Sequence, residues 1–371
     1  QAGGRRTSSL RPEFAFLAFR NDEVCRDPHF SFDPDAEFLL PDTPGFFDAV
    51  LAYLSDDNPR HVFSDSAAFK TLTRTQLEAL ARTFEGHEKD VRKNSAFINE
   101  MLSRLAPGAD DDTDDPRVKR AWLERILAFA RTLPAARHDL RHLARHNLLD
   151  LARAQGDYSD EDLFLEYVKA GRGMRAGAPE SVSSSAYNNA AAVLRHVPHG
   201  TALIEDYLAA FRRKGKNLHR LFGEWLPNDL LDRVSAETDL LSGKPVDQVN
   251  VKCLSEAAFK ALRERVDLEW SKTNPRVFAA NDAVVLDLEV KNVKKLQVAI
   301  YEMDAFAACR KYGNEMPSDI DLEACVPNVV RTFDYSRLTP FARHTEHLDF
   351  PELAQPGLYV IECSGGGVAR A

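Results

Sequence analysis

Three histidines at regular spacing are the residues of this chain that come nearest to a metal-binding pattern. His138, His142 and His146 recur every four residues in a segment whose apolar residues follow a helical period. Residues four apart lie on the same face of an α-helix, so neighbouring imidazoles can share one metal ion, and zinc commonly takes such nitrogen ligands. These histidines are therefore the candidate metal ligands, and a metal-dependent hydrolase that uses them is one alternative for the function.

The surroundings of the three histidines favour a simpler interpretation. A hydrolytic zinc helix carries Glu directly after its first His, but this chain has Asp139 there, and the sequence names no further ligand. At roughly 100° per residue the histidine row lies opposite the apolar face, which predicts that the row faces solvent. The apolar face comprises Leu140, Leu143, Ala144, Leu148 and Leu151. We interpret the row as a basic stripe that faces solvent or a partner, and we expect no bound metal and no cofactor.

Two runs of like charge are further candidates for ligand binding. Asp110–Asp115 (DDDTDD) has carboxylates that suit Ca²⁺, but it lacks the sixth-position glycine and the distal Glu of an EF-hand loop, so we expect a solvated acidic loop. Arg212–Lys216 (RRKGK), followed by His219 and Arg220, is a local basic patch. Cations at the C-terminus of a helix interact favourably with its dipole, which explains the patch. A site for an anion or an acidic partner is the alternative.

The sequence contains no catalytic signature. Gly-x-Ser-x-Gly is absent, and Gly365–Gly367 lacks the Lys-Ser/Thr of a phosphate-binding loop, so it is predicted to be a turn between strands. Cys363 lies in an alternating apolar stretch, where an inert buried thiol is expected. No catalytic residue is assigned, and we expect the chain not to be an enzyme.

Composition excludes two classes of partner and favours a third. The net charge of −9 over 371 residues argues against a general nucleic-acid binder, which needs clustered Lys and Arg. No apolar run approaches the roughly 20 residues of a membrane span. A protein partner is expected, whereas the localisation and the oligomeric state are not predicted.

The cysteines favour free thiols in a reducing compartment. There are 5 of them, widely spread and without a CxxC pair, so neither a zinc site nor a disulfide framework is indicated. Cys309 and Cys325 form the pair to test for a bridge.

The elements that carry these residues fall into a helical region and a β-region. Residues 1–45 are predicted to be irregular, and 46–265 to be α-helical, with a linker near 172–187 that is small and polar. Thr75–Glu78 has the pattern of a capping box, and Asp115-Pro116 that of a helix start. The fold class is therefore expected to be α+β, with an N-terminal helical array before an antiparallel β-sandwich.

The predicted sandwich occupies residues 266–371. In Ala283–Met303, Leu286, Leu288 and Val290 alternate with polar residues, and Val298 and Ile300 resume the alternation after a short polar turn. Several short strands separated by turns follow, which is typical of an antiparallel sandwich. The chain begins at Gln1 without Met and ends at Ala371 within a strand-like stretch. We expect it to be a piece of a longer protein, with the sandwich truncated at its C-terminal end.

Two stretches of the β-region are LDLEVKNVKKLQVAIYEMD and LDFPELAQPGLYVIECSGGGVARA, and in the second a turn delivers Tyr359 to the start of a late strand. In these stretches the β-region resembles a macroglobulin-type β-sandwich module of large α2-macroglobulin-like proteins. The chain departs from that family in two respects. It contains no Cys-Gly-Glu-Gln thioester sequence, and its helical array is not part of the usual layout.

The resemblance implies a non-catalytic interaction or structural segment of an α2-macroglobulin-like protein. Protease binding or inhibition is the implied activity of the parent protein, with its determinants outside this piece. Two alternatives remain open at this point: the metal-dependent hydrolase described above, and an α-solenoid adaptor for which the sandwich serves only as a cap.

Overall fold

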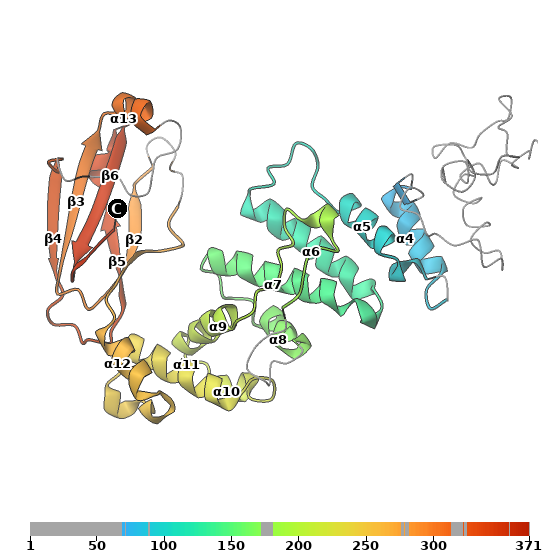
Figure 1. Cartoon of the computed structure of the whole chain (residues 1–371), viewed down its shortest axis with the longest axis horizontal. Coiled ribbons are helices and arrows are strands. Elements are labelled where there is room, and N and C mark those ends of the chain that lie inside the picture. Colours follow the sequence, from blue (N-terminus) through green and yellow to red (C-terminus); the bar gives the residue numbers. More distant parts are fainter. Residues whose placement is uncertain are drawn as a thin grey trace, which may run out of the picture. The chain divides into compact units, whose positions relative to one another are not determined.

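The fold is α+β: an array of helices is followed along the chain by an antiparallel β-sandwich, as predicted (Figure 1). The predicted irregular segment 1–45 and residues 172–180 of the predicted linker lie outside the described residues. The chain divides into two compact units, Gln1–Leu151 with Glu180–His199, and Ala152–Pro179 with Gly200–Ala371. The computed structural model describes residues 69–70, 72–87, 90–171, 181–275, 278, 282–312, 322, 325–355 and 357–370.

Three α-helices of the first unit begin at polar caps. Asp115 accepts a hydrogen bond from the amide of Arg117 and precedes Pro116, which confirms the predicted helix start. The predicted capping box at Thr75–Glu78 was wrong by two residues, because Thr73 and Gln76 form it instead. Both pairs satisfy the same spacing. The elements are α4 (Arg74–Thr83), η2 (Val91–Lys93), α5 (Ser95–Arg104), α6 (Pro116–Thr132), η3 (Ala135–Arg137), α7 (His138–Ala154, which continues into the second unit) and η5 (Asn188–Ala190).

The helices of the second unit pack around a cluster of aromatic side chains. Phe164 stacks on Tyr207 with ring centroids 4.9 Å apart, and Phe211 stacks on Phe222 at 5.7 Å. The elements are α8 (Glu161–Ala170), α9 (Ala202–Arg213), α10 (Leu218–Phe222), α11 (Asn228–Leu241), η6 (Val246–Gln248), η7 (Val251–Cys253) and α12 (Glu256–Glu264).

The β-sandwich consists of a three-stranded sheet, β1-β2-β5, and a four-stranded sheet, β4-β3-β6-β7, both antiparallel. Leu288, Val298 and Ile300 are buried between the sheets, as their alternation predicted. The hydroxyl of Tyr359 donates to the carbonyl of Gln355 (3.2 Å), a contact typical of a tyrosine corner. The elements are β1 (Asp267–Trp270), β2 (Val285–Lys291), β3 (Lys295–Met303), α13 (Ala305–Tyr312), β4 (Val329–Asp334), β5 (His344–Asp349), η8 (Pro351–Ala354), β6 (Leu358–Gly365) and β7 (Val368–Arg370).

The end of α12 is tied to the turn between β2 and β3. Lys291 Nζ donates a 2.7 Å hydrogen bond to the carbonyl of Arg265, and Asn292 Nδ2 donates to the carbonyls of Arg263 and Arg265. Phe341 packs against Phe259 of α12, with ring centroids 5.1 Å apart. The helices and the sandwich of the second unit are therefore in direct contact.

A second contact joins the sandwich to the helices of this unit. Gly156, in the turn between α7 and α8, has φ of +68°, and a Cβ placed on it would lie 2.4 Å from Cγ2 of Thr273. Thr273 belongs to the loop that follows β1. The loop therefore rests on this turn, where a side chain at residue 156 would require Thr273 to shift.

Within the described part of the chain, none of the helices is both long and apolar enough to cross a membrane.

Candidate functional site

The histidine row lies on α7, but two of its three members do not face solvent. His142 and His146 are 4% and 7% exposed, so the prediction of a solvent-facing stripe was wrong for these two. A chain segment that is distant in sequence packs along the same helix. Residues 181–199 run beside α7, where Asn147 exchanges hydrogen bonds with the backbone of Arg195 (2.9 and 3.0 Å) and Tyr187 donates to Asp139 (2.6 Å). Helical periodicity does not reveal such a covering segment.

The environment of His142 suits a neutral imidazole that takes part in packing. Burial lowers the pKa of His142 to about 4, and the positive charges of His146, Arg145 and His138 act in the same direction. His138 is the first residue of α7 and is partly exposed. Among the residues that the structure describes, no three His, Cys, Asp or Glu side chains form a group suited to a metal ion. The expectation of no bound metal stays a prediction.

The acidic loop uses its carboxylates for local hydrogen bonds. Asp111 accepts from the amide of Gly108 (2.7 Å), Asp112 accepts from the amide of Asp114 (2.9 Å), and Asp115 caps α6. Asp110–Asp114 are exposed. These side chains stabilise a turn and a helix start, which agrees with the predicted acidic loop.

Cys363 and the Gly365–Gly367 turn have structural roles. Cys363 is fully buried, and burial raises the pKa of its thiol to about 12, so it is an inert core residue. Gly366 and Gly367 have positive φ in the turn between β6 and β7, as the turn prediction required. Cys325 is a free, exposed cysteine, whereas the side chain of Cys309, its candidate partner for a bridge, is not among those that the structure describes.

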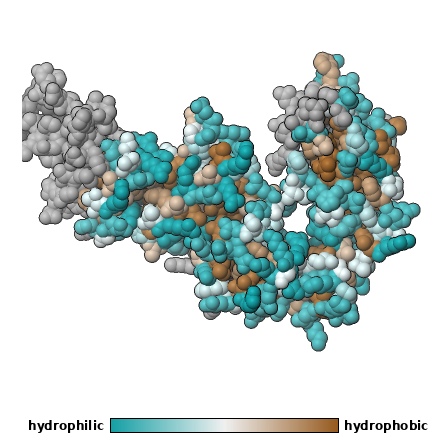
Figure 2. All heavy atoms as spheres, turned by 180° about the vertical axis from the view of Figure 1, so that it is seen from behind, coloured by the Kyte–Doolittle hydropathy of each residue, from teal (hydrophilic) through white to brown (hydrophobic). Residues whose placement is uncertain are grey.

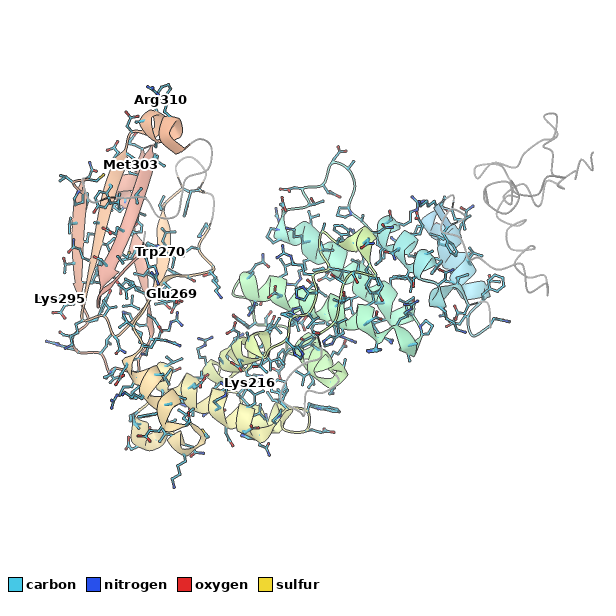
Figure 3. All side chains as sticks on the ribbon, viewed as in Figure 1. Lys216, Glu269, Trp270, Lys295, Met303 and Arg310 are labelled. Carbon is cyan, nitrogen blue, oxygen red and sulfur yellow. The ribbon has the colours of Figure 1, made fainter. Side chains whose placement is uncertain are left out.

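One surface of the second unit carries a cluster of positive charges. Hydrophilic residues cover much of the visible face, and apolar residues form separate patches between them (Figure 2). Four exposed cations gather where α9 ends and α10 begins, and we call this set the basic patch: Arg213, Lys214, Lys216 and Arg220. Lys216 is labelled in Figure 3. The patch coincides with the basic run that the sequence singled out.

Local structure fixes the backbone of the basic patch. Gly215 has φ of +79°, which allows the chain to turn at the end of α9. Asn217 then caps α10 by accepting from the amide of Arg220 (3.1 Å). Lys214 Nζ donates to the carbonyl of Tyr158 (3.3 Å), and Lys216 Nζ pairs with Glu161 (3.0 Å). The patch therefore lies against the segment between α7 and α8.

The basic patch holds more positive charge than is needed to offset the helix dipoles at the C-termini of α9 and α11. Helices α9 and α11 run in the same direction, since Glu205 pairs with Arg233 near their starts and Arg212 pairs with Asp239 near their ends. Arg212 and Lys244 both pair with the carboxylate of Asp239, so cations already lie at the C-termini of these two helices. Arg213, Lys214 and Arg220 make no ion pair with any residue in the described ranges. Their charge is therefore open to a partner.

Comparison with known proteins identifies the two regions. Residues 33–266 match the family model of the actin-binding protein F N-terminal domain, and residues 296–371 match that of the AbpF first immunoglobulin-like domain. The chain is also 26% identical over 302 residues to actin-binding protein F of Dictyostelium discoideum. That alignment covers 77% of this chain and 13% of the relative, so the chain spans only a small part of the relative's length. No solved structure matches.

These matches correct the family and the functions expected from the sequence. The resemblance to a macroglobulin-type module was wrong, because the alternating strands and the Tyr359 corner are shared by many antiparallel sandwiches and do not specify one family. The inferred α2-macroglobulin-like, protease-binding segment was wrong for the same reason. The matches give no support to the hydrolase built on His138, His142 and His146, nor to the α-solenoid adaptor. The match to the N-terminal domain covers more than half of this chain, so the chain belongs to the actin-binding protein F family.

Proposed function

We propose that this chain is a non-catalytic, actin-binding segment of a larger protein. The observation that carries the proposal is the consecutive match to the N-terminal domain and the first immunoglobulin-like domain of one family, whose curated relative is named for binding actin. That name describes a binding activity and not a catalysed reaction, which favours a non-enzyme with a protein partner. The function of the whole relative is not transferred, since the chain corresponds to 13% of it.

We propose the basic patch as the part of the helical region that contacts actin. Arg213, Lys214 and Arg220 are exposed and make no ion pair within the described residues, although the whole chain carries a net charge of −9. Exposed positive charges attract an oppositely charged surface of a protein partner and accelerate association. A carboxylate-rich surface on the partner fits this chemistry.

The proposal includes the domain boundaries 46–265 for the helical region and 266–371 for the sandwich. The match to the immunoglobulin-like domain begins at residue 296, but β1 and β2 precede this residue. They pair with each other, and β2 also pairs with β5. Helix α12 ends at Glu264 and β1 begins at Asp267. The sheet pairing supports an immunoglobulin-like domain that includes these two strands.

Co-sedimentation of the 371-residue chain with actin filaments tests the function. We expect the chain to pellet with filaments in a saturable manner and to remain in solution without them. A variant with Lys214→Glu and Arg220→Glu is expected to bind several-fold more weakly, because two attractive charges become repulsive. The matched control carries Lys252→Glu and Lys260→Glu, which are exposed cations elsewhere in this unit. A wild-type chain that stays in the supernatant at every filament concentration contradicts the function.

Equal binding of the patch variant and the control, both near the wild-type value, contradicts only the proposed contact surface.

A further inference from the structure

The turn between α7 and α8 exposes a serine whose hydroxyl is free. Residues 157–160 of this turn are neither helix nor strand, and Ser159 is exposed among them. Its amide donates to Asp157 (3.0 Å), and its carbonyl accepts from the amide of Glu161 (3.0 Å). Its hydroxyl makes no hydrogen bond to any residue in the part of the chain that the structure describes. The backbone therefore holds the serine in place while the side chain stays open to an enzyme.

Two lysines of the basic patch lie on either side of Ser159 along this turn. Lys214 Nζ donates to the carbonyl of Tyr158 (3.3 Å), which belongs to the peptide group that joins Tyr158 to Ser159. Lys216 Nζ pairs with Glu161, two residues beyond the serine (3.0 Å). Lys214 is exposed and makes no ion pair within the described ranges. An anion attached to Ser159 Oγ therefore has an ammonium group beside it whose charge is not yet paired.

Three carboxylates directly follow the serine. Asp160, Glu161 and Asp162 occupy the next three positions, and Asp162 is exposed. Asp160 caps α8, so the other two lie in its first turn, where backbone amides lack intrahelical partners and helices fray. Kinases select their substrates by charge pattern. A serine followed by carboxylates fits a serine/threonine kinase whose substrate groove is basic.

We propose that Ser159 is a phosphorylation site, and that its phosphate pairs with Lys214 and lowers the affinity of the basic patch for a carboxylate-rich partner. The regulation rests on the proposed actin-binding function, whereas the modification site does not. The kinase transfers the γ-phosphoryl group of ATP. The bond from the γ-phosphorus to its bridging oxygen breaks and the bond from Ser159 Oγ to phosphorus forms. ADP leaves, and the hydroxyl proton passes to a carboxylate of the kinase.

The charge of the phosphate is large compared with that of the basic patch. A phosphoserine carries about −2 charges at pH 7, which offsets roughly half of the four cations of the patch. Of the neighbouring carboxylates, Asp160 caps α8 and Glu161 is paired with Lys216, so Lys214 is the cation that remains for the phosphate. A partner that the patch attracts is therefore attracted less after the modification.

Phosphorylation of the 371-residue chain tests the site. The chain is incubated with Mg²⁺, ATP and a serine/threonine kinase that prefers acidic substrates, after the kinase has been verified on an acidic serine peptide. Mass spectrometry then identifies the modified residues. We expect phosphate on Ser159, its loss in Ser159→Ala, and several-fold slower modification in Asp162→Asn. The internal control is Ser255, which is exposed but is followed by a single carboxylate, and we expect it to stay unmodified. A chain without phosphate on Ser159 overturns the proposal.

The pairing with Lys214 is measured without any partner. A limiting amount of an amine-reactive reagent labels each lysine according to the fraction of its amine that is unprotonated, and mass spectrometry quantifies the label. We expect Lys214 to be labelled several-fold less in the phosphorylated chain, because a neighbouring anion favours the protonated amine. Lys260, which is exposed on α12, serves as the control and is expected not to change. Equal labelling of Lys214 in the two forms overturns the pairing.

Actin co-sedimentation then tests the regulation. The phosphorylated chain is expected to bind filaments several-fold more weakly than the unmodified chain, whereas Ser159→Ala treated with the kinase binds like the unmodified wild type. Equal binding of the two wild-type forms overturns the regulation. An unmodified chain that stays in the supernatant contradicts the proposed function, while the phosphate on Ser159 and the labelling of Lys214 still report the modification site. Circular dichroism verifies that each variant is folded.

Discussion

The side-chain amide of Asn292 donates a 2.7 Å hydrogen bond to the main-chain carbonyl of Arg265, which follows the last residue of α12. The same amide also reaches the carbonyl of Arg263. Carbonyls at the end of a helix lack intrahelical partners, so this turn of the sandwich satisfies groups that the helix leaves open. Asn292 has φ of +57°, and apart from glycines it alone has a positive φ among the described residues. The residue joins the helical region to the sandwich of the second unit.

Asn292→Gly isolates the two hydrogen bonds of this joint. Glycine adopts positive φ without strain, so this variant removes the side chain and keeps the backbone. We expect the free energy of unfolding to fall by about 1 kcal/mol, the usual net value of such bonds. Asn292→Ala is expected to lose roughly a further 1 kcal/mol, because alanine is strained in this region. Urea denaturation followed by tryptophan fluorescence measures both. A glycine variant as stable as the wild type shows that the bonds do not hold the joint.

His142 predicts a dependence of stability on pH. Burial lowers its pKa from 6.5 to about 4 in the folded state. Between these values the unfolded chain binds more protons, so the stabilising contribution is complete above pH 6.5 and is lost as the pH falls toward 4. The difference corresponds to about 3 kcal/mol. Denaturation curves at pH 7.5 and pH 4.5 measure it.

The control for His142 is a substitution that removes the titrating group. His142→Gln is expected to flatten this part of the pH dependence, whereas the exposed His199→Gln tests a surface histidine of the same unit. An identical loss of stability in the wild type and in His142→Gln on going from pH 7.5 to pH 4.5 contradicts the assignment to His142.

Arg92 is predicted to be among the most sensitive charged residues of the first unit. It is 9% exposed, pairs with Asp90 (2.8 Å) and Glu85 (2.7 Å), and donates to the carbonyl of Thr132 at the end of α6. Arg92→Ala leaves the buried carboxylate of Asp90 without its partner, which is expected to cost about 3–5 kcal/mol. Arg74→Ala breaks the exposed pair with Glu78 and is expected to cost less than about 0.5 kcal/mol. Thermal denaturation that ranks the two variants equally excludes the buried network as the cause.

Local sequence patterns predicted where the helices and strands lie better than they predicted which other segments pack on them. Alternation placed Leu288, Val298 and Ile300 in the sandwich core, because each depends only on its own strand and on the sheet face that it occupies. The burial of His142 and the packing of residues 181–199 along α7 depend on tertiary structure, which the pattern of α7 does not contain. The basic run was visible in the sequence. That it holds more cations than the helix C-termini use became clear only from the structure, in which Arg212 pairs with Asp239.

The boundary of the immunoglobulin-like domain is tested with two fragments. Residues 296–371 correspond to the family match, but they lack β1, β2 and the first residue of β3. Without β1 and β2 only β5 remains of the three-stranded sheet, and Leu296, Val298 and Ile300 lose the opposite layer of the core. Burial of apolar surface between two layers is what stabilises such a domain, so this fragment is expected not to fold cooperatively.

Residues 266–371 retain every strand that the structure describes, and this fragment is expected to unfold in a single cooperative transition. It loses the hydrogen bonds from Lys291 and Asn292 to the carbonyl of Arg265 and the packing of Phe341 on Phe259. We therefore expect its unfolding midpoint to lie below that of the sandwich in the complete chain. Circular dichroism and the fluorescence of Trp270 in β1 measure the transition. A cooperative transition in the fragment 296–371 as well shows that β1 and β2 are dispensable, and it moves the domain boundary to the start of β3.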